Sequence, residues 1–259
     1  MKQTCGLEIR RVSRIFSRDG KQVLALDKTS FTVEPGRFAS IIGPSGCGKS
    51  TLFHIIAGLM KPTEGDVLAC GESILEKPGT VGYMLQKDLL LPWRTILENV
   101  ILGMEIQGIS RKAAAEQALP LMEKYGLGGF DGHYPSELSG GMRQRAALLR
   151  TLLCDREIIL LDEPFGALDA QTRFSMQGWL LRLWQDFHKT VLFVTHDIDE
   201  AIYLSDEILV FTPRPGTLRE RLEVPLARPR TREMLSDPAF CRLKIHLLEL
   251  LQEGGERLG

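Results

Sequence analysis

The stretch GPSGCGKST at residues 43–51 constrains the fold of this chain more than any other. It matches the pattern G-x-x-x-x-G-K-[ST], which places glycines, a lysine and a hydroxyl at fixed spacing. An apolar run at 38–42 precedes it, and apolar residues at helical spacing follow over 52–57. The sequence therefore predicts a loop between a buried strand and a helix, as in an α/β fold.

The residue types in this loop suit a phosphate group. Glycines let successive backbone N–H groups turn toward phosphate oxygens, and a helix that begins there adds partial positive charge. We expect Lys49 to contact the β- and γ-phosphates of a nucleotide and Ser50 to ligate Mg²⁺. A glycine-rich turn that binds nothing is the alternative. The residues of the loop are Gly43, Pro44, Ser45, Gly46, Cys47, Gly48, Lys49, Ser50 and Thr51.

Length and charge bound the class of protein. A chain of 259 residues is long enough for one large α/β domain with a subdomain. Its formal net charge of −1 argues against nucleic acid as the main partner, because binding a phosphate backbone normally needs a basic face. The N-terminus lacks an apolar signal core, and no stretch approaches roughly 18 uninterrupted apolar residues. We therefore expect a chain that is neither secreted nor membrane-spanning.

The five cysteines are far apart in the sequence. They form no C-x-x-C pair and have no adjacent histidine, so a zinc site is not indicated. We expect reduced thiols, as in a cytosolic protein. The cysteines are Cys5, Cys47, Cys70, Cys154 and Cys241.

Polar and apolar positions alternate over residues 7–40, with turn signals at 18–21 and 34–36. Short alternating runs of this kind predict half-buried antiparallel strands ahead of the phosphate loop. Phe16 lies just before the first turn, where its ring could stack on adenine. A role in the core is the alternative for this residue.

Three later apolar runs, at 80–85, 157–161 and 190–195, end in polar residues, as the run at 38–42 ends in the phosphate loop. Continuous apolar runs of this length are typical of parallel strands buried on both faces. In such a sheet, ligands bind outside the carboxyl ends of the strands. We therefore expect the terminal residues to converge on one site. They are Gln86, Asp162, Glu163 and His196.

Residues 87–154 have a helical pattern and read as a subdomain attached to the sheet. Thr95 and Ser110 are suited to cap helices, and Pro120 suggests a kink or break in the second of these. A glycine-rich break precedes Ser139, Gly140 and Gly141, which open a further helix to Leu153.

The chain changes character after Phe211. Five prolines interrupt it, and six arginines lie between Arg214 and Arg232. A solvated connector is the plain interpretation of this segment, and a basic strip that touches anionic lipid or a partner is the alternative. A final helix after Pro238 has an apolar face that we expect to pack on the domain or on a second copy.

The carboxylates at 162 and 163 suggest a division of labour. A carboxylate at a strand end beside a phosphate loop holds the Mg²⁺ of the nucleotide, which we assign to Asp162. Glu163 is then available to polarise the attacking water. His196 would contact the γ-phosphate or orient that water.

Ser139, Gly140 and Gly141 form a second candidate anion site at a helix N-terminus. The phosphates of one nucleotide already have a loop in the same chain. We therefore expect this second surface to meet the γ-phosphate of a nucleotide held by a second copy, so that two chains enclose two nucleotides. A tight turn before a helix is the alternative.

The ordered set of motifs resembles the nucleotide-binding subunit of an ATP-binding cassette (ABC) transporter. It comprises GPSGCGKST, Gln86, LSGGMRQR at 138–145, IILLDEP at 158–164, ALD at 167–169 and THD at 195–197. The resemblance covers residues from about 7 to 212 and implies ATP and Mg²⁺ as cofactors. One departure is Met142, where the family often has glutamine.

The resemblance also implies residue roles and a domain plan. Phe16 would stack on adenine, Gln86 would sense Mg²⁺ and couple to the membrane part, Ser139 to Met142 would complete the site of the second copy, and Asp169 would signal across the dimer. The implied fold is α/β, a P-loop NTPase with a RecA-like core of mainly parallel strands. The expected parts are an antiparallel β subdomain at 7–40, the core at 38–86 and 155–212, a helical subdomain at 87–154 and a C-terminal extension at 213–259, all in one domain of 1–259.

The segment 86–93, the phosphate loop and the run DEPFGALDAQTR are similar to those of bacterial importers for nitrate, sulfonates, taurine and thiamine-precursor pyrimidines. This implies an ATPase at the cytoplasmic face of the inner membrane, with permease subunits and, indirectly, an extracytoplasmic solute-binding protein. Residues 89–93 would form a groove for a permease helix or pack inside the helical subdomain. The alternatives for function are an ABC exporter or mechanotransmitter, a P-loop small-molecule kinase and a non-catalytic nucleotide-binding regulator.

Overall fold

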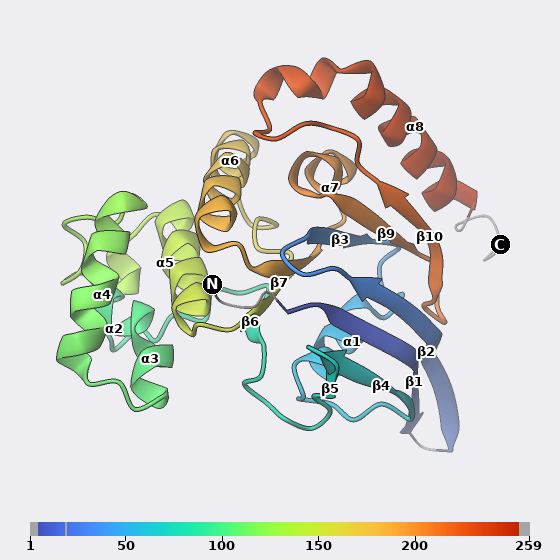
Figure 1. Cartoon of the computed structure of the whole chain (residues 1–259), viewed down its shortest axis with the longest axis horizontal. Helices are drawn as coiled ribbons and strands as arrows, with labels where there is room; N and C mark the ends of the chain where they lie inside the picture. The colour runs from blue at the N-terminus through green and yellow to red at the C-terminus, as the bar shows by residue number, and fades with distance from the viewer. Residues whose placement is uncertain (1–4, 19, 254–259) are drawn as a thin grey trace.

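The computed structural model describes residues 5–18 and 20–253. Two sheets and a group of helices form the molecule (Figure 1). The strands are β1 (Leu7–Arg18), β2 (Lys21–Val33), β3 (Phe38–Ile42), β4 (Glu64–Ala69), β5 (Glu72–Ser73), β6 (Gly82–Met84), β7 (Ile158–Asp162), β8 (Thr190–Val194), β9 (Glu207–Phe211) and β10 (Leu218–Glu223). The α-helices are α1 (Lys49–Ile56), α2 (Ile96–Val100), α3 (Leu102–Ile106), α4 (Arg111–Lys124), α5 (Gly140–Leu153), α6 (Ala170–Phe187), α7 (Ile198–Leu204) and α8 (Pro238–Glu253), and η1 (Pro135–Glu137) and η2 (Arg232–Ser236) are 3-10 helices.

The larger sheet has the order β10-β9-β3-β8-β7-β6. β9, β3, β8, β7 and β6 run parallel, and β10 pairs antiparallel with β9 at the edge. Alternate side chains of the central strands enter two different cores; on β8, Val191 and Phe193 join one cluster and Leu192 and Val194 the other. Both faces of the sheet are thus buried, which explains the continuous apolar runs and confirms the predicted parallel sheet.

The smaller sheet is antiparallel, with the order β2-β1-β4-β5 (Figure 1). β1 pairs with β2, the next strand in the chain, as the alternation predicts. The predicted range of 7–40 for this part omits β4 and β5, which lie within the range assigned to the core. β4 pairs with β1 across more than 50 intervening residues at Leu7–Ala69. The sequence pattern between 64 and 73 does not reveal a partner so far away.

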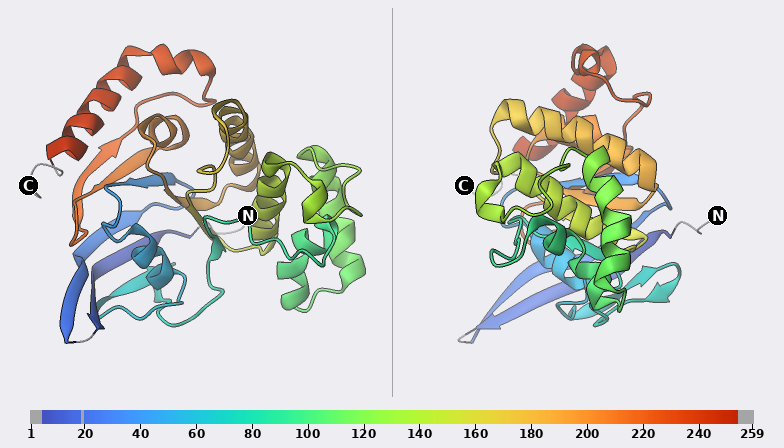
Figure 2. Two further views of the ribbon diagram at one scale, coloured as in Figure 1. Left: turned by 180° about the vertical axis from the view of Figure 1, so that it is seen from behind. Right: turned by 90° about the vertical axis from the view of Figure 1, so that its left-hand side faces the viewer.

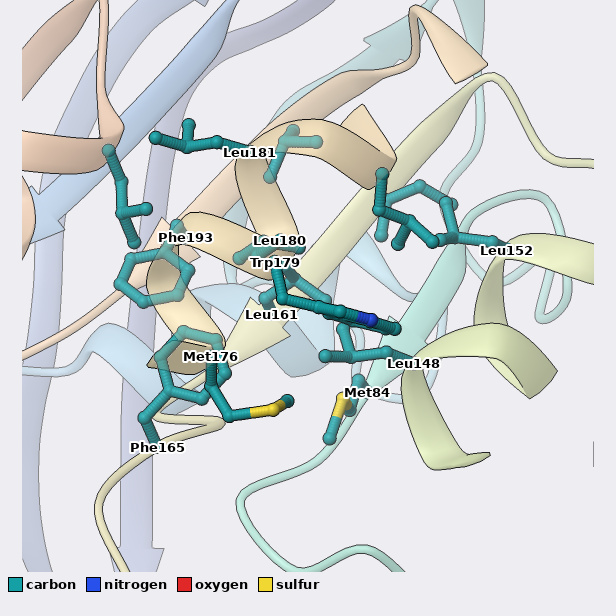
Figure 3. Packing of buried hydrophobic residues seen from close by; sticks show 14 of the residues in the cluster. Met84, Leu148, Leu152, Leu161, Phe165, Met176, Trp179, Leu180, Leu181 and Phe193 are labelled. Atoms are coloured by element: carbon teal, nitrogen blue, oxygen red, sulfur yellow. The ribbon is translucent and has the colours of Figure 1, made fainter. Parts of the chain in front are cut away.

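The helices α2 to α5 form a group at one side of the parallel sheet (Figures 1 and 2). Thr95 caps α2 in a reciprocal capping box with Glu98, and Ser110 caps α4. Pro120 lies inside α4, which continues past it, so of the predicted kink or break the break does not occur. Figure 3 shows how this group joins the core: Leu148 and Leu152 of α5 meet Trp179 and its neighbours on α6 beside the sheet.

The segment after Phe211 is not a solvated connector. It adds β10 to the sheet and continues to α8, which packs on α7 (Figure 1). Arg228 donates to Asp206 at 2.8 Å and Arg230 donates to the carbonyl of Ser205 at 2.6 Å, so these arginines serve the fold and not a lipid surface. Burial lowers the pKa of Arg230 to about 10. On α8, Phe240 and Leu247 are buried, as the predicted apolar face requires.

The expectation of reduced cysteines is wrong for two of them. Cys5 and Cys70 form a disulfide, with a Cα–Cα distance of 4.9 Å. The reason is the pairing of β1 with β4, because Leu7 opposite Ala69 brings Cys5, two residues before Leu7, close to Cys70, the residue after Ala69. Cys47, Cys154 and Cys241 are free. No helix in the described part of the chain is long and apolar enough to cross a membrane.

Candidate functional site

A cavity of about 440 Å³ opens at the carboxyl ends of β3 and β7. This is the edge at which the sequence predicts a ligand site. The cavity brings together residues from both sheets, the phosphate loop and the segment after β6. The predicted site residues in its lining are Phe16, Ser45, Gly46, Gly48, Lys49, Ser50, Thr51, Gln86, Asp162 and Glu163.

The phosphate loop lies between β3 and α1, where the sequence predicts it. Gly48 caps α1 with φ of 108°, and a Cβ there would lie 2.9 Å from the carbonyl oxygen of Ala25. Only glycine fits such a position. The Lys49 ammonium donates to the carbonyl oxygens of Gly43 at 2.7 Å and Pro44 at 3.0 Å, which holds its charge beside the loop. Cys47 is buried behind the loop, with its sulfur 3.8 Å from that ammonium.

Asp162 ends β7 and is 7% exposed. The Tyr83 hydroxyl donates to it at 3.4 Å, and Ser50 also bonds to it. Burial and the neighbouring Glu163 raise the pKa of Asp162, whereas these two hydrogen bonds lower it. Two carboxylates and a hydroxyl therefore gather at the strand end, with an excess of negative charge that a cation would relieve.

Glu163 is contacted by two other residues that follow strands of the parallel sheet, Gln86 and His196. Gln86 donates to its carboxylate at 3.2 Å, and Nδ1 of His196 lies 3.4 Å from the same oxygen. The backbone of Glu163 has φ of 44°, a conformation that residues other than glycine rarely adopt. Its N–H donates to the carbonyl oxygen of Val194 at 2.9 Å. The structure thus brings Gln86, Glu163 and His196 together, although His196 lies just outside the cavity lining, in a small hollow that Glu163 also lines.

The segment from Ser139 to Met142 lies outside the lining of the cavity. Ser139 caps α5 by accepting from the N–H of Met142 at 3.3 Å, and the helix begins at Gly140, directly after this cap. Asp169 likewise caps α6, accepting from the N–H of Thr172 at 3.0 Å, and these hydrogen bonds lower its pKa. Neither Ser139 nor Asp169 lines the cavity of its own chain.

Three residues in the cavity lining are absent from the sequence-based site: Val23, Ala25 and Arg214. Val23 and Ala25 lie on β2, and Val23 pairs with Phe16 across the two strands. Their alternation signals one face of a strand, which places them beside Phe16. The guanidinium of Arg14 lies 4.8 Å from the ring centroid of Phe16. No local signal points to Arg214, because it comes from the far end of the chain.

A second hollow, of about 270 Å³, lies between β6, α3 and α5. Val81, Leu102 and Ile106 give it an apolar lining, and the side chain of Ile106 is 79% exposed. Arg150 also lines it and donates to the carbonyls of Asp88 and Leu89. The residues predicted to form a groove, 89–93, differ in burial: Leu90 is buried in the core, whereas Leu89 and Trp93 are exposed.

The sequence profile of the ABC transporter family matches residues 26–166. This chain belongs to that family. It is an ATP-binding subunit of an ABC transporter, and it hydrolyses ATP.

Relatives of this ABC subunit match it over nearly its whole length. An uncharacterized ABC transporter ATP-binding protein of Methanocaldococcus jannaschii is 45% identical, over 95% of this chain and 91% of its own. The aliphatic sulfonates import ATP-binding protein SsuB of Bacillus thuringiensis is 41% identical, over 96% of this chain and 97% of its own. A solved dimeric ATP-binding cassette bound to ADP and Pi is 31% identical with a TM-score of 0.74, over 85% of this chain and all of its own.

Proposed function

We propose that this ABC subunit powers the uptake of a small solute, of the sulfonate type, through partner permease subunits at the cytoplasmic face of the inner membrane. The observation that carries the proposal is the convergence of Gln86 and His196 on Glu163 beside the phosphate loop. Similarity to an aliphatic sulfonates import protein over nearly the whole chain supports the solute class. Importers of the same type also take up nitrate or thiamine-precursor pyrimidines, and these are the alternative solutes.

Glu163 is the proposed general base. Its carboxylate lies at the mouth of the phosphate loop, where it would accept the proton of a water that attacks the γ-phosphate. Gln86 and His196 contact the same oxygen of this carboxylate, and His196 would also donate to the γ-phosphate. Lys49 would move from the carbonyls of its own loop to the β- and γ-phosphates. Phe16, on the apolar side of the cavity, would stack on adenine.

The residues around Asp162 suit Mg²⁺. A buried carboxylate, the Ser50 hydroxyl and the Gln86 amide offer hard oxygen ligands, and the nucleotide phosphates would supply more. No cluster of three or more acidic, histidine or cysteine side chains that could hold a metal alone occurs among residues 5–18 and 20–253. Mg²⁺ would neutralise charge on the phosphates during transfer.

A second copy of the chain is the proposed partner of the cavity. The N-terminus of α5, with Ser139, Gly140 and Gly141, would meet the γ-phosphate bound by the other copy, and Asp169 would lie at the same interface. Met142 takes part only through its backbone N–H, so the departure from glutamine removes a side-chain contact and not the anion site. The dimeric cassette bound to ADP and Pi supports this arrangement.

The hollow beside α3 is the proposed docking site for a permease helix. An apolar floor and an exposed Ile106 suit the apolar face of a short helix. Arg150 lines the hollow and also holds the carbonyls of the two residues that lie close after Gln86 in sequence. Movement of a bound helix would therefore shift the segment that carries Gln86, and through the hydrogen bond of Gln86 it would also shift the carboxylate of Glu163. A solute-binding protein outside the cell would deliver the solute to the permease.

The test is co-purification of tagged Glu163→Gln protein from its native membranes in Mg-ATP, with partners identified by mass spectrometry. We expect an importer-type permease, and uptake assays on cells that lack this subunit would then show loss of sulfonate import. Recovery of an exporter, or of no membrane protein, would contradict the importer assignment.

Two exposed isoleucines make a matched pair for the docking step. Ile106→Asp places a charge in the hollow, and Ile245→Asp places the same charge on the outer side of α8, where the side chain is 57% exposed. The first variant should lose the permease and the second should retain it, while both still bind ATP. Equal retention by both variants would place the permease on another surface.

A further inference from the structure

The nucleotide cavity contains a basic side chain that the ABC motifs do not include. Arg214 lines the cavity together with Phe16 and Ala25, from the loop that joins β9 to β10. It lies well beyond residues 26–166, which the family profile covers. Among the described residues of the lining, Lys49 and Arg214 are the basic ones.

Arg214 differs from the other arginines of its segment, because its side chain has no hydrogen-bond or ion-pair partner in the described part of the chain. Each of the others contacts this chain: Arg219 donates to the carbonyl of Leu250, Arg221 pairs with Glu207, Arg228 with Asp206, Arg230 with the carbonyl of Ser205, and Arg232 lies over the ring of Phe174. Within residues 5–18 and 20–253, Arg214 makes no hydrogen bond or ion pair. The fold therefore uses five arginines for itself and leaves the sixth exposed at the cavity.

The loop that carries Arg214 is held firmly against the nucleotide site. The N–H of Gly216 donates to Ala25 at 2.9 Å, and the N–H of Asp27 donates back to Gly216 at 3.1 Å, which ties the loop to β2. A Cβ on Gly216 would lie 1.9 Å from the carbonyl oxygen of Cys47, so the loop also touches the backbone of the phosphate loop. Thr212 closes it by donating to the carbonyl of Pro215 at 3.0 Å. Arg214 is thus presented from a fixed backbone and not from a mobile tail.

The elements that line the cavity indicate which part of a nucleotide Arg214 would meet. Phe16 and Ala25 come from the paired strands β1 and β2 and give apolar lining, whereas Lys49 and Glu163 come from the phosphate loop and the end of β7, where the β- and γ-phosphates would bind. The Arg214 loop is bonded to β2 and touches the phosphate loop through Gly216. We propose that Arg214 binds the α-phosphate of the nucleotide, between the base and the phosphates held by Lys49. The proposal rests on the nucleotide site described above and adds a residue to it.

A series of shortened nucleotides tests this position. Affinities for ADP, AMP and adenosine are measured by competition against labelled ADP, for wild-type protein, Arg214→Ala and Arg214→Lys. Arg232→Ala is the matched control, because it removes the same charge from the same segment at a residue that contacts Phe174 and does not line the cavity. A hydrogen bond between charged groups at this exposed site predicts that Arg214→Ala weakens ADP and AMP alike, roughly 10-fold.

Adenosine affinity should stay unchanged in Arg214→Ala, Arg214→Lys should recover part of the loss, and Arg232→Ala should bind all three ligands as the wild type does. Unchanged ADP affinity in Arg214→Ala would overturn the proposal. An equal loss for adenosine would move the contact to the base or ribose, and a loss for ADP without a loss for AMP would move it to the β-phosphate; either result refutes the α-phosphate contact. Wild-type protein that binds none of the three would contradict the nucleotide site itself.

Discussion

Glu163 combines three features that rarely coincide in one residue. Its backbone has φ of 44°, its carboxylate contacts both Gln86 and His196, and its side chain is 22% exposed at the cavity. A strained backbone conformation costs of order 1–3 kcal/mol and persists only where the surroundings enforce it. Here the bond from its N–H to Val194 and the end of β7 enforce it. Glu163 lines the cavity beside the phosphate loop.

Glu163→Gln should therefore abolish turnover while it preserves binding. Glutamine has nearly the same shape and can still contact Gln86 and His196, but it cannot accept a proton at neutral pH. We expect ATP hydrolysis to fall by about 10²–10⁴-fold, with ATP affinity within a few-fold of wild type. Steady-state phosphate release and equilibrium ATP binding measure the two quantities. Turnover close to wild type would rule out Glu163 as the base.

Glu200, four residues after His196, is a buried acid with a structural task. It accepts from the hydroxyl of Thr195 and, at 3.1 Å, from the amide of Gln177, which fixes the loop that carries His196 to α6. Burial raises the pKa of Glu200 above its ordinary value, although these hydrogen bonds oppose the shift. The folded state therefore holds this proton to higher pH than the unfolded state does.

The sign of the resulting pH dependence follows from proton binding. Between the unfolded and folded pKa values the native state binds more protons, so the contribution of Glu200 to stability falls as pH rises through that window. The glutamine of Glu200→Gln does not titrate, and its side chain has nearly the same shape and can still form hydrogen bonds. As pH rises above about 4.5, the free energy of unfolding of the variant should increase relative to that of the wild type, by at most about 1.4 kcal/mol per pH unit. Urea unfolding at several pH values measures the difference, and a difference independent of pH would contradict the burial argument.

At the level of elements, local signals succeeded where the chemistry of a segment decides its structure. The serine and two glycines at 139–141 predict the start of α5, and the apolar run at 38–42 predicts β3. β10 escaped prediction because its residues alternate Leu, Arg and Glu between prolines, which resembles a charged connector. Only pairing with β9 makes it a strand. The Cys5–Cys70 bond escaped for the same reason, since it depends on a pairing across 65 residues.

The residues of the candidate site also differ in whether a local sequence signal or a long-range contact determines their position. Residues at strand ends and in the phosphate loop could be predicted, because a parallel sheet places them at one edge. Arg214 could not be predicted, since its position depends on hydrogen bonds between the β9–β10 loop and Ala25. Val23 had a partial signal in the alternation of β2, but nothing in the alternation shows that this face lines the cavity.

The apolar face of α8 gives a prediction at this scale. Leu247 is fully buried against the domain, whereas its neighbour Leu248 is 41% exposed. Leu247→Ala should lower the free energy of unfolding by about 2–5 kcal/mol, because it leaves a cavity under the helix. Leu248→Ala should change it by less than about 1 kcal/mol. Urea denaturation compares the pair, and equal losses would mean that α8 does not pack as described.

At the level of the whole molecule, each chain carries one nucleotide cavity and a second helix N-terminus, that of α5, which does not line this cavity. Ser139 caps α5, but neither it nor Asp169 lines the cavity of its own chain. A pair of chains related by two-fold symmetry would use both surfaces twice. The proposed dimer would therefore give the N-terminus of α5 a phosphate to bind in a chain that already has a phosphate loop.

This arrangement can be tested with a substitution that spares the fold. Aspartate caps helices as well as serine does, so Ser139→Asp should leave α5 intact while it places a carboxylate where the γ-phosphate of the other copy would lie. In the Glu163→Gln background, ATP should drive dimer formation in size-exclusion chromatography with light scattering. Adding Ser139→Asp should abolish the dimer and preserve ATP binding, because like charges repel.

Ser110→Asp supplies the control for that experiment, since Ser110 caps α4 in the same group of helices with the same kind of bond to a backbone N–H. It introduces the same charge and keeps the same cap, so it changes the net charge of the helical part without touching the proposed interface. The Glu163→Gln dimer should survive it. Dimers that form equally well with Ser139→Asp would show that α5 does not face a bound phosphate, and the two nucleotide sites would then have to be complete within single chains.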